Sequence, residues 1–293
     1  MKILLFGRNG QLGSEFQRLL PRLGKTTALD QEDLDLGDIH ALQQKLNELK
    51  PDLIVNASAY TAVDRAETEV ETAMTINAQV PGIMSEWARA SGAVLIHYST
   101  DYVFDGKKGT PYTELDIASP LNVYGKSKLA GEENILQAGD ACLILRTSWV
   151  YSLQGNGFVN KVLEWARRNE TLKIVSDQIS NPTRARDLAE ATFSLISTHR
   201  DNLQDVMKER RGVYHLAGTG YTSRHEWAKH ILANDPNRTE QLVRAIEPVS
   251  SEEFPTPAVR PLFSALDCTK FKETFGFSLP GWADSLRAAM QGE

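Results

Sequence analysis

The first half of the chain alternates short apolar runs with longer amphipathic stretches, and this alternation restricts its possible folds more than any other feature. The runs ILLF, LIV, VLI and CLIL are continuous, whereas a strand with one face in water alternates apolar and polar residues. Continuous runs are typical of parallel strands that helices cover on both faces. Right-handed strand–helix–strand units of this kind predict a doubly wound parallel α/β sheet of the Rossmann type.

A glycine-rich turn follows the first apolar run. Gly7, Gly10 and Gly13 form the pattern GxxGxxG in GRNGQLG, directly after an expected buried strand and before an amphipathic helix. Glycines let the backbone turn tightly and approach a pyrophosphate, and a helix N-terminus offers free amides to phosphate oxygens. We therefore expect a dinucleotide here. The expected contacts are Gly7, Arg8, Asn9, Gly10, Gln11, Leu12 and Gly13.

Two charged residues give opposite indications about the cofactor. Asp30 ends the second expected strand, 17 residues beyond Gly13, where a carboxylate suits the ribose 2′-hydroxyl of NAD and repels the 2′-phosphate of NADP. Arg8 lies inside the glycine turn, where a guanidinium suits that phosphate. The sequence therefore predicts that NADPH and NADH are both usable, without a preference.

The regular alternation ends near residue 150. We expect residues 1–150 to form an NAD(P)-binding Rossmann domain. Residues 151–293 are expected to form mainly a smaller, loop-rich α/β substrate-binding region, with segments that return to the Rossmann sheet. In this part the sequence predicts helices within 158–170, 181–199 and 223–235, the last capped by Ser223, and strands within 172–178 and 212–218. Residues 247–262 hold four of the 12 prolines and are expected to contain no regular structure.

Composition excludes several other classes of protein. A net charge of −6 without a long basic stripe argues against nucleic-acid binding. The N-terminal apolar run has four residues, too short for a signal peptide or a membrane span, so a cytoplasmic protein is expected. Cys142 and Cys268 match no metal or redox spacing, and the six histidines show no HExxH pattern.

Polar residues follow the fourth expected strand, where ligands bind in open parallel sheets. They are Ser99, Thr100, Asp101 and Tyr102. The next helix begins with YGKSK, the chain's only YxxxK pattern, which places Tyr124 and Lys128 on one face. Turn chemistry alone also explains the polar residues, and a lone YxxxK is weak evidence.

The order of these motifs carries a stronger signal. GRNGQLG, NASAYTAVD, STDYVFDG and PLNVYGKSKLAGE together resemble the extended short-chain dehydrogenase/reductases. Within that superfamily, STDYVFDG, LRTSWVY, DQISNPT and RPLFSAL resemble the dTDP-4-dehydrorhamnose reductases, and the resemblance extends over essentially the whole chain.

The resemblance implies hydride transfer from a nicotinamide to the C4 ketone of a dTDP-linked 4-keto-6-deoxy sugar, the last step of dTDP-L-rhamnose synthesis for surface polysaccharides such as lipopolysaccharide. Tyr124 would be the general acid. Lys128 would lower the pKa of the tyrosine and bind the nicotinamide ribose. Thr100 would bind the sugar oxygen and the tyrosine.

Further positions follow from the resemblance alone. The additional cofactor contacts are Asp35, Leu36, Ala59, Tyr60 and Thr61, where Tyr60 is larger than the residue expected. The substrate contacts are Val63, Thr100, Asp101, Trp149 and Arg260, with Arg260 directed to the diphosphate. Core packing remains an alternative for Trp149, and a solvated loop position for Arg260. Mg²⁺ at a dimer contact, through Glu15, Asp187 and Glu293, has weak support, so no metal site is assigned and a homodimer stays open.

Other functions remain open on the sequence. The closest alternative is a reductase of another nucleotide-linked 4-keto-6-deoxy sugar. Nucleotide-sugar 4-epimerases share the Thr/Tyr/Lys set but retain their cofactor. A binding protein such as the regulatory subunit of methionine adenosyltransferase, or a sensor of the nicotinamide pool, would show no turnover of a dTDP sugar.

Overall fold

The computed structural model describes residues 1–292 and contains a six-stranded sheet in which all neighbours are parallel. Its order is β10-β5-β4-β3-β1-β2. The strands are β1 (Lys2–Phe6), β2 (Lys25–Leu29), β3 (Leu53–Asn56), β4 (Val94–Thr100), β5 (Cys142–Thr147) and β10 (Gly212–His215). The predicted doubly wound α/β fold is confirmed. Because β2 and β3 lie on opposite sides of β1, the order reverses at β1, where open sheets bind ligands.

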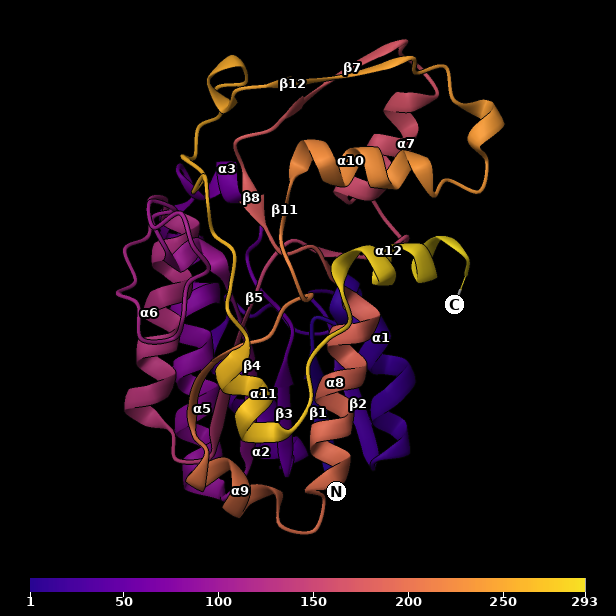
Figure 1. Ribbon diagram of the computed structural model, residues 1–293. Coiled ribbons are helices and arrows are strands. Elements are labelled where there is room, and N and C mark those ends of the chain that lie inside the picture. The colour runs from indigo at the N-terminus through magenta and orange to yellow at the C-terminus, as the bar shows by residue number, and fades with distance from the viewer. Residues whose placement is uncertain (293) are drawn as a thin grey trace.

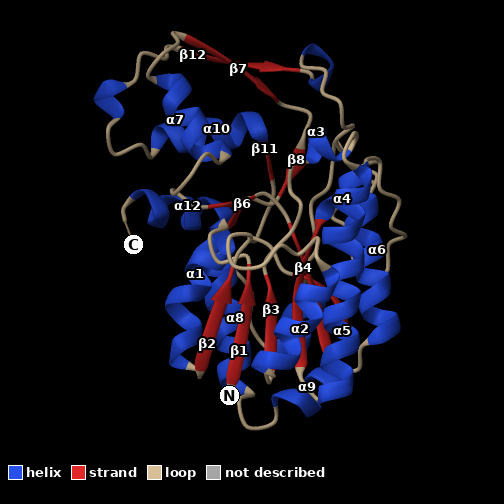
Figure 2. Ribbon diagram, turned by 180° about the vertical axis from the view of Figure 1, so that it is seen from behind, coloured by secondary structure: helices blue, strands red, loops and turns tan. Residues whose placement is uncertain are grey.

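Helices cover both faces of this sheet (Figures 1 and 2). One face packs on α1 (Gln11–Leu19), α8 (Ala185–Thr198), α9 (Leu203–Glu209) and α11 (Thr269–Phe275). The other packs on α2 (Ile39–Leu49), α5 (Val80–Ser91) and α6 (Val123–Ala138). Successive residues of β1 point to opposite sides, Ile3 and Leu5 to the first core and Leu4 and Phe6 to the second. This double burial explains the continuous apolar runs.

A second layer lies beyond the carboxyl ends of the sheet strands (Figure 2). It contains α7 (Phe158–Ala166), α10 (Arg224–Ala233), α12 (Trp282–Met290) and the parallel pair β7 (Thr171–Val175) and β12 (Ala245–Val249). Trp227 is buried in its core, which also contains Val162, Ile231 and Leu286. The expected cap of α10 is confirmed, because the Glu226 amide donates to Ser223 Oγ at 3.1 Å.

The remaining elements are short. They are β6 (Val150–Tyr151) with β9 (Thr183–Arg184), β8 (Ile179–Ser180) with β11 (Thr222–Ser223), α3 (Val63–Ala66), α4 (Val70–Met74) and the 3₁₀ turns 20–22, 101–103, 238–240 and 251–253. After residue 150 the chain contributes both to the second layer and, through α8, α9, β10 and α11, to the sheet layer. The division at residue 150 stays a prediction.

The expectation that residues 247–262 contain no regular structure is wrong at their start. β12 pairs with β7 in register, with Pro248 opposite Ile174. β12 has only this one strand neighbour in the two-stranded sheet. Proline is tolerated in edge strands because only one side of the strand needs amide donors.

A π-helical turn at Thr75–Gln79 joins α4 to α5 and packs against α6. A Cβ on Gly131 of α6 would lie 2.1 Å from the Asn77 carbonyl oxygen. Glycine therefore lets the two backbones touch. Within residues 1–292, none of the helices combines the length and apolar character that a membrane crossing requires.

We predict that Gly131→Ala destabilises the fold by about 1–3 kcal/mol, since the obstructing atom is backbone and the helices must separate. Urea denaturation followed by circular dichroism measures the change. Lys126→Ala, at an exposed position on the same helix, is the control and should change stability by no more than about 0.5 kcal/mol. Equal stability of both variants would contradict the close contact.

Candidate active site

The glycine turn has the geometry that a pyrophosphate needs. Gly7 adopts a φ of +81°, which disfavours any side chain. A Cβ on Gly13 would lie 1.8 Å from the Gly7 carbonyl oxygen, so only glycine lets α1 begin this close to β1. Gly10 precedes the first turn of α1, whose free amides face the end of the sheet. The turn therefore fits a bound dinucleotide.

A cleft of about 700 Å³ opens beside this turn. Of the expected cofactor contacts, it brings together Gly7, Asp30, Asp35, Leu36, Ala59 and Tyr60. The sequence reasoning missed a second wall from the α3–α4 segment and the π-helical turn: Arg65, Glu69, Glu71, Thr72, Thr75 and Ile76. These residues follow NASAYTAVD on a stretch that carried no recognisable motif.

Other residues of the glycine turn have partners within the protein. Arg8 forms an ion pair with Asp33 at 2.8 Å, and the Asn9 amide donates to Asp30 at 2.7 Å. Gln11 reaches the second layer, where its Oε1 accepts from the Ser152 amide at 2.7 Å. Leu12 is buried in the core, so only its backbone faces a ligand.

Tyr60 lines the cleft and is fixed there by hydrogen bonds within the protein. Its hydroxyl donates to Glu69 at 2.6 Å, and its amide donates to the Asn77 side chain at 2.8 Å. Glu69 also pairs with Arg65. Thr61 is exposed beside it. The larger side chain noted in the sequence is thus accommodated by a hydrogen-bonded wall of the cleft.

Helix α6 presents Tyr124 from its first turn, as predicted. Asn122 caps the helix by accepting from the Gly125 amide at 2.8 Å. A Cβ on Gly125 would lie 2.2 Å from the Tyr102 carbonyl oxygen, so glycine brings this turn against the exit of β4. Burial raises the pKa of Tyr124, and a hydrogen bond with Thr100 opposes that rise. The structure therefore brings Thr100 and Tyr124 together.

Lys128 lies one turn further along and is buried. Its Nζ donates to the Tyr98 carbonyl oxygen at 2.7 Å and lies 3.1 Å from His97 Nε2. Burial lowers its pKa to about 8, while Glu132 acts in the opposite direction. The sequence reasoning missed His97, which sits inside an apolar strand.

A buried ion pair supports this part of the site. Arg146 of β5 donates to Glu132 of α6 through Nε at 2.9 Å and Nη2 at 2.6 Å. Ser99 donates to the same carboxylate at 2.5 Å. One carboxylate therefore joins β4, β5 and α6 directly beneath the catalytic candidates.

Asp101 is buried rather than open to the cleft. It accepts from Ser264 at 2.5 Å, Ser180 at 3.0 Å and Thr100 at 3.2 Å. Ser180 and Ser264 belong to DQISNPT and RPLFSAL, so Asp101 joins the exit of β4 to later parts of the chain. Burial raises the pKa of Asp101 to about 6, although these hydrogen bonds oppose the rise.

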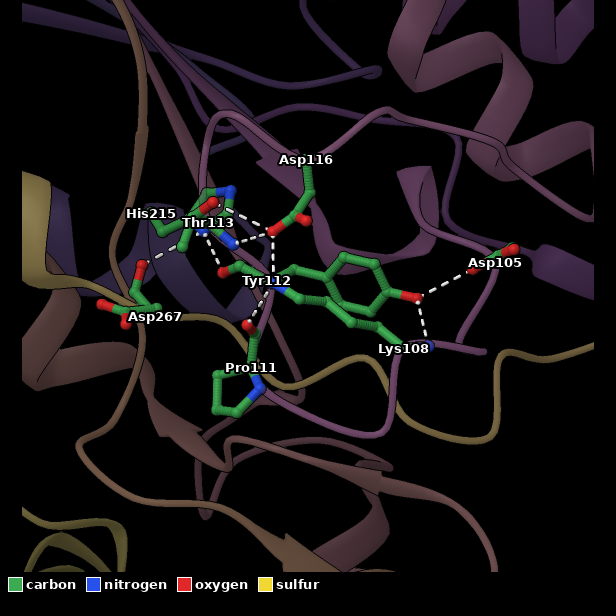
Figure 3. A network of polar contacts seen from close by, with 8 residues as sticks. All are labelled: Asp105, Lys108, Pro111, Tyr112, Thr113, Asp116, His215 and Asp267. Atoms are coloured by element: carbon green, nitrogen blue, oxygen red, sulfur yellow. Dashed lines mark hydrogen bonds and ion pairs between the residues drawn. The ribbon is translucent and has the colours of Figure 1, made fainter.

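The segment after β4 is fixed by a polar network around Tyr112 (Figure 3). The Tyr112 hydroxyl donates to Asp105 at 2.8 Å, and His215 Nδ1 lies 3.0 Å from the Tyr112 carbonyl oxygen. Lys108 and Asp116 form an ion pair at 2.6 Å. These contacts hold residues 105–116 against β10 and the segment that contains Asp267.

Two of the expected substrate residues, Trp149 and Arg260, have partners within the protein. Trp149 has a φ of +40° and stacks on Trp227, with 5.5 Å between ring centroids. Arg260 pairs with Asp64 at 2.8 Å, directly after Val63. Trp149 is therefore part of an aromatic cluster, and the charge of Arg260 is already matched by a carboxylate.

Arg224 is a cation that the sequence reasoning missed. Its guanidinium lies 3.8 Å from the ring centroid of Trp149 and 4.8 Å from that of Phe158. Among residues 1–292, its side chain has these ring contacts but no ion pair with a carboxylate. Asp101 and Tyr102 lie close enough to influence its pKa, which burial lowers to about 10.

The residues suggested for Mg²⁺ have other contacts. Glu15 pairs with Arg18 at 3.6 Å, while Asp187 accepts from Ser285 and lies 3.8 Å from Arg184. Glu293 lies outside the described residues. In the described part of the chain, no group of three or more His, Cys, Asp or Glu side chains is placed to hold a metal ion.

The sheet and its glycine turn define a nucleotide-binding α/β protein of the Rossmann type. A model of the family described as RmlD substrate binding domain matches residues 1–293, and the chain belongs to this family.

Individual relatives agree with this assignment. A protein of Burkholderia thailandensis described as dTDP-4-dehydrorhamnose reductase is 40% identical over 291 residues, with 96% of this chain and 95% of the relative covered. A crystal structure of a dTDP-4-dehydrorhamnose reductase from Clostridium acetobutylicum matches with a TM-score of 0.90 and 34% identity, covering 99% of both chains. The Bacillus anthracis enzyme of that name, in complex with NADP, gives 0.89 and 33%, covering 100% of this chain and 99% of that one.

We predict that Asp101→Asn changes how stability depends on pH. The folded pKa of about 6 exceeds the value of about 4 for an unfolded aspartate. The carboxyl therefore contributes stability below about pH 4, and this contribution is lost as the pH rises to about 6. Two pKa units correspond to about 3 kcal/mol, so the variant should gain stability relative to the natural protein across this window.

Thermal unfolding of both proteins between pH 4 and pH 8 measures the difference. Asp105→Asn is the control of opposite sign, because the hydrogen bond from Tyr112 lowers the pKa of that exposed carboxyl. If the unfolding temperatures of Asp101→Asn and of the natural protein changed with pH in the same way, the raised pKa of Asp101 would be refuted.

Proposed function

We propose that this protein reduces the C4 ketone of dTDP-4-dehydro-L-rhamnose to give dTDP-L-rhamnose, with NADPH or NADH as reductant. Membership in the RmlD family and 40% identity to a dTDP-4-dehydrorhamnose reductase carry this proposal. The relative with bound NADP supports NADPH as a cofactor. The glycine turn and the cleft at β1 fit such a dinucleotide.

The residues that we place in the reaction are Thr100, Tyr124 and Lys128. When bound, the reduced nicotinamide supplies a hydride. Tyr124 donates its phenolic proton to the oxygen that was the ketone, and Thr100 holds that oxygen and the tyrosine by hydrogen bonds. Because burial favours the neutral phenol, Tyr124 carries its proton at neutral pH and needs a nearby positive charge to release it. Lys128, in its ammonium form, supplies such a charge.

Arg8 and Asp30 bear on the choice of cofactor. Arg8 pairs with Asp33, which also accepts from the Asp30 amide at 2.9 Å, and Asp30 lines the cleft. A 2′-phosphate would compete with Asp33 for Arg8, whereas a 2′-hydroxyl would donate to Asp30. This arrangement supports use of both cofactors.

Arg224 joins the substrate contacts in this proposal, in addition to Val63, Asp101, Trp149 and Arg260. A guanidinium that has no carboxylate partner among residues 1–292 and lies over aromatic rings is suited to the diphosphate of a sugar nucleotide. Arg260 would have to share its charge with Asp64.

The proposed reaction predicts turnover of the sugar nucleotide. Enzymatically prepared dTDP-4-dehydro-L-rhamnose should be consumed with loss of NADPH or NADH absorbance, and NMR should identify dTDP-L-rhamnose. Tyr124→Phe should lower kcat by about 10²–10⁴-fold while retaining cofactor binding, because it removes one proton donor. Tyr214→Phe, which removes a hydroxyl that donates to Arg210, is the matched control.

Each other outcome has a defined meaning. Absence of turnover by the natural protein, despite cofactor binding, would reject the reaction with this sugar. Turnover that survives in Tyr124→Phe would reject Tyr124 as the acid and keep the reaction.

A further prediction distinguishes the contributions of Arg224 and Arg260 to substrate binding. Arg224→Met preserves packing against Trp149 and should raise the KM for the dTDP sugar by about 10–100-fold. This change corresponds to the loss of one charge-assisted hydrogen bond of about 1.5–3 kcal/mol. Arg260→Met should raise it less, since that charge is matched by Asp64. The reverse order in steady-state kinetics would assign the diphosphate to Arg260.

A further inference from the structure

A series of buried polar contacts links Lys128 to strands β4 and β3 of the sheet. Asn56 ends β3, and its Nδ2 lies 3.0 Å from His97 Nδ1 on β4. His97 Nε2 lies 3.1 Å from Lys128 Nζ. Asn56, His97 and Lys128 are exposed by 1%, 0% and 1%, so bulk water does not reach these contacts. Each nitrogen must therefore match its neighbour as donor or acceptor.

The backbone fixes the direction of the first contact. The Ser58 amide can only donate, and it donates to Asn56 Oδ1 at 3.1 Å. Ser58 Oγ donates to the same oxygen at 2.6 Å. The Asn56 oxygen therefore faces Ser58, and its NH₂ group faces His97. It follows that His97 Nδ1 accepts a hydrogen bond and carries no proton.

The second contact follows from the first. Burial lowers the pKa of His97 well below its usual value, so the ring is neutral. A neutral imidazole without a proton on Nδ1 carries it on Nε2. That proton points at Lys128 Nζ, which must accept with a lone pair while donating to the Tyr98 carbonyl oxygen. Only a neutral amine can do both.

We propose that His97, oriented by Asn56, is a positioning residue that holds Lys128 as a neutral amine in the cofactor-free protein. The Nε2 proton thereby lowers the pKa of Lys128 below the value of about 8 that burial, opposed by Glu132, gives it. To become an ammonium with matched contacts, Lys128 takes the proton of Nε2, while one proton from solvent binds Nδ1 and the Asn56 amide turns over. That rotation breaks both hydrogen bonds from Ser58, which favours the amine. The proposal rests on the assigned role of Lys128 for its kinetic consequence, but not for the tautomer.

Other charged groups around Lys128 do not alter this direction. On α6, Glu132 favours the ammonium, but it is held by Arg146 of β5 and Ser99 of β4. Tyr124 is neutral one turn earlier. Beyond it, Asp101 is held by Ser180 and Ser264. The imidazole is thus the group in direct contact with Nζ that sets its proton.

The tautomer is tested on the natural protein. With ¹⁵N-labelled histidine and no cofactor, the ring nitrogens of His97 at pH 7 should show a protonated Nε2 and an unprotonated Nδ1. Loss of these signals in His97→Asn provides the assignment. A protonated Nδ1, or an imidazolium, would overturn the proposal.

Asn56→Asp provides the kinetic test. A carboxylate accepts from Ser58 and from Nδ1–H together, which turns the Nε2 lone pair toward Nζ and stabilises the ammonium. The alkaline decline of kcat/KM should therefore move to higher pH by one unit or more. Asn134→Asp adds the same charge on α6, where Asn134 contacts the Ala78 carbonyl and not His97, and should leave the decline in place.

The outcomes of the two tests are distinct. Turnover with an unshifted decline in Asn56→Asp would reject the coupling while keeping the proposed reaction. No turnover by the natural protein would reject that reaction, and the NMR result would still decide the tautomer.

Discussion

The close contact of helix α6 with the ends of β4 and β5 is the constraint on which the candidate site depends. Glu132 lies between Arg146 and Ser99 in a buried, hydrogen-bonded ion pair, and loss of one partner would leave a charge buried without compensation. Gly125 and Gly131 remove the side chains that would keep this helix away. Tyr124 and Lys128 thus reach Thr100 and His97 because glycine and one carboxylate hold a single helix in register.

The later half of the chain is attached to this same region rather than placed beside it. Asp101 accepts from Ser180 and Ser264, which come from two distant segments. Arg260 returns to Asp64 on α3. The catalytic candidates and the candidate sugar contacts therefore share buried polar partners.

Features with a local physical cause were predictable from sequence. Double burial produces the continuous runs of β1, β3, β4 and β5, and the glycine turn and YGKSK stand at fixed positions relative to those strands. Features that depend on contacts between distant segments were not. In the sequence, His97 is a single polar residue within an apolar strand. Only the structure shows that it lies between Asn56 and Lys128. Arg224 belongs to no motif, and only the three-dimensional structure shows that it stacks on aromatic rings without a carboxylate partner in the described part of the chain. Pro248 was misjudged because the sequence does not reveal that its strand has one neighbour.

That proline has a consequence for how copies of the protein behave in concentrated solution. A two-stranded sheet exposes backbone along both sides, and such edges invite strands of other molecules to add to them. At Pro248 the outer strand has no N–H to offer, and its neighbours Glu247 and Lys173 carry charge. The same residue that seemed to forbid a strand thus protects the second layer from aggregation through strand addition.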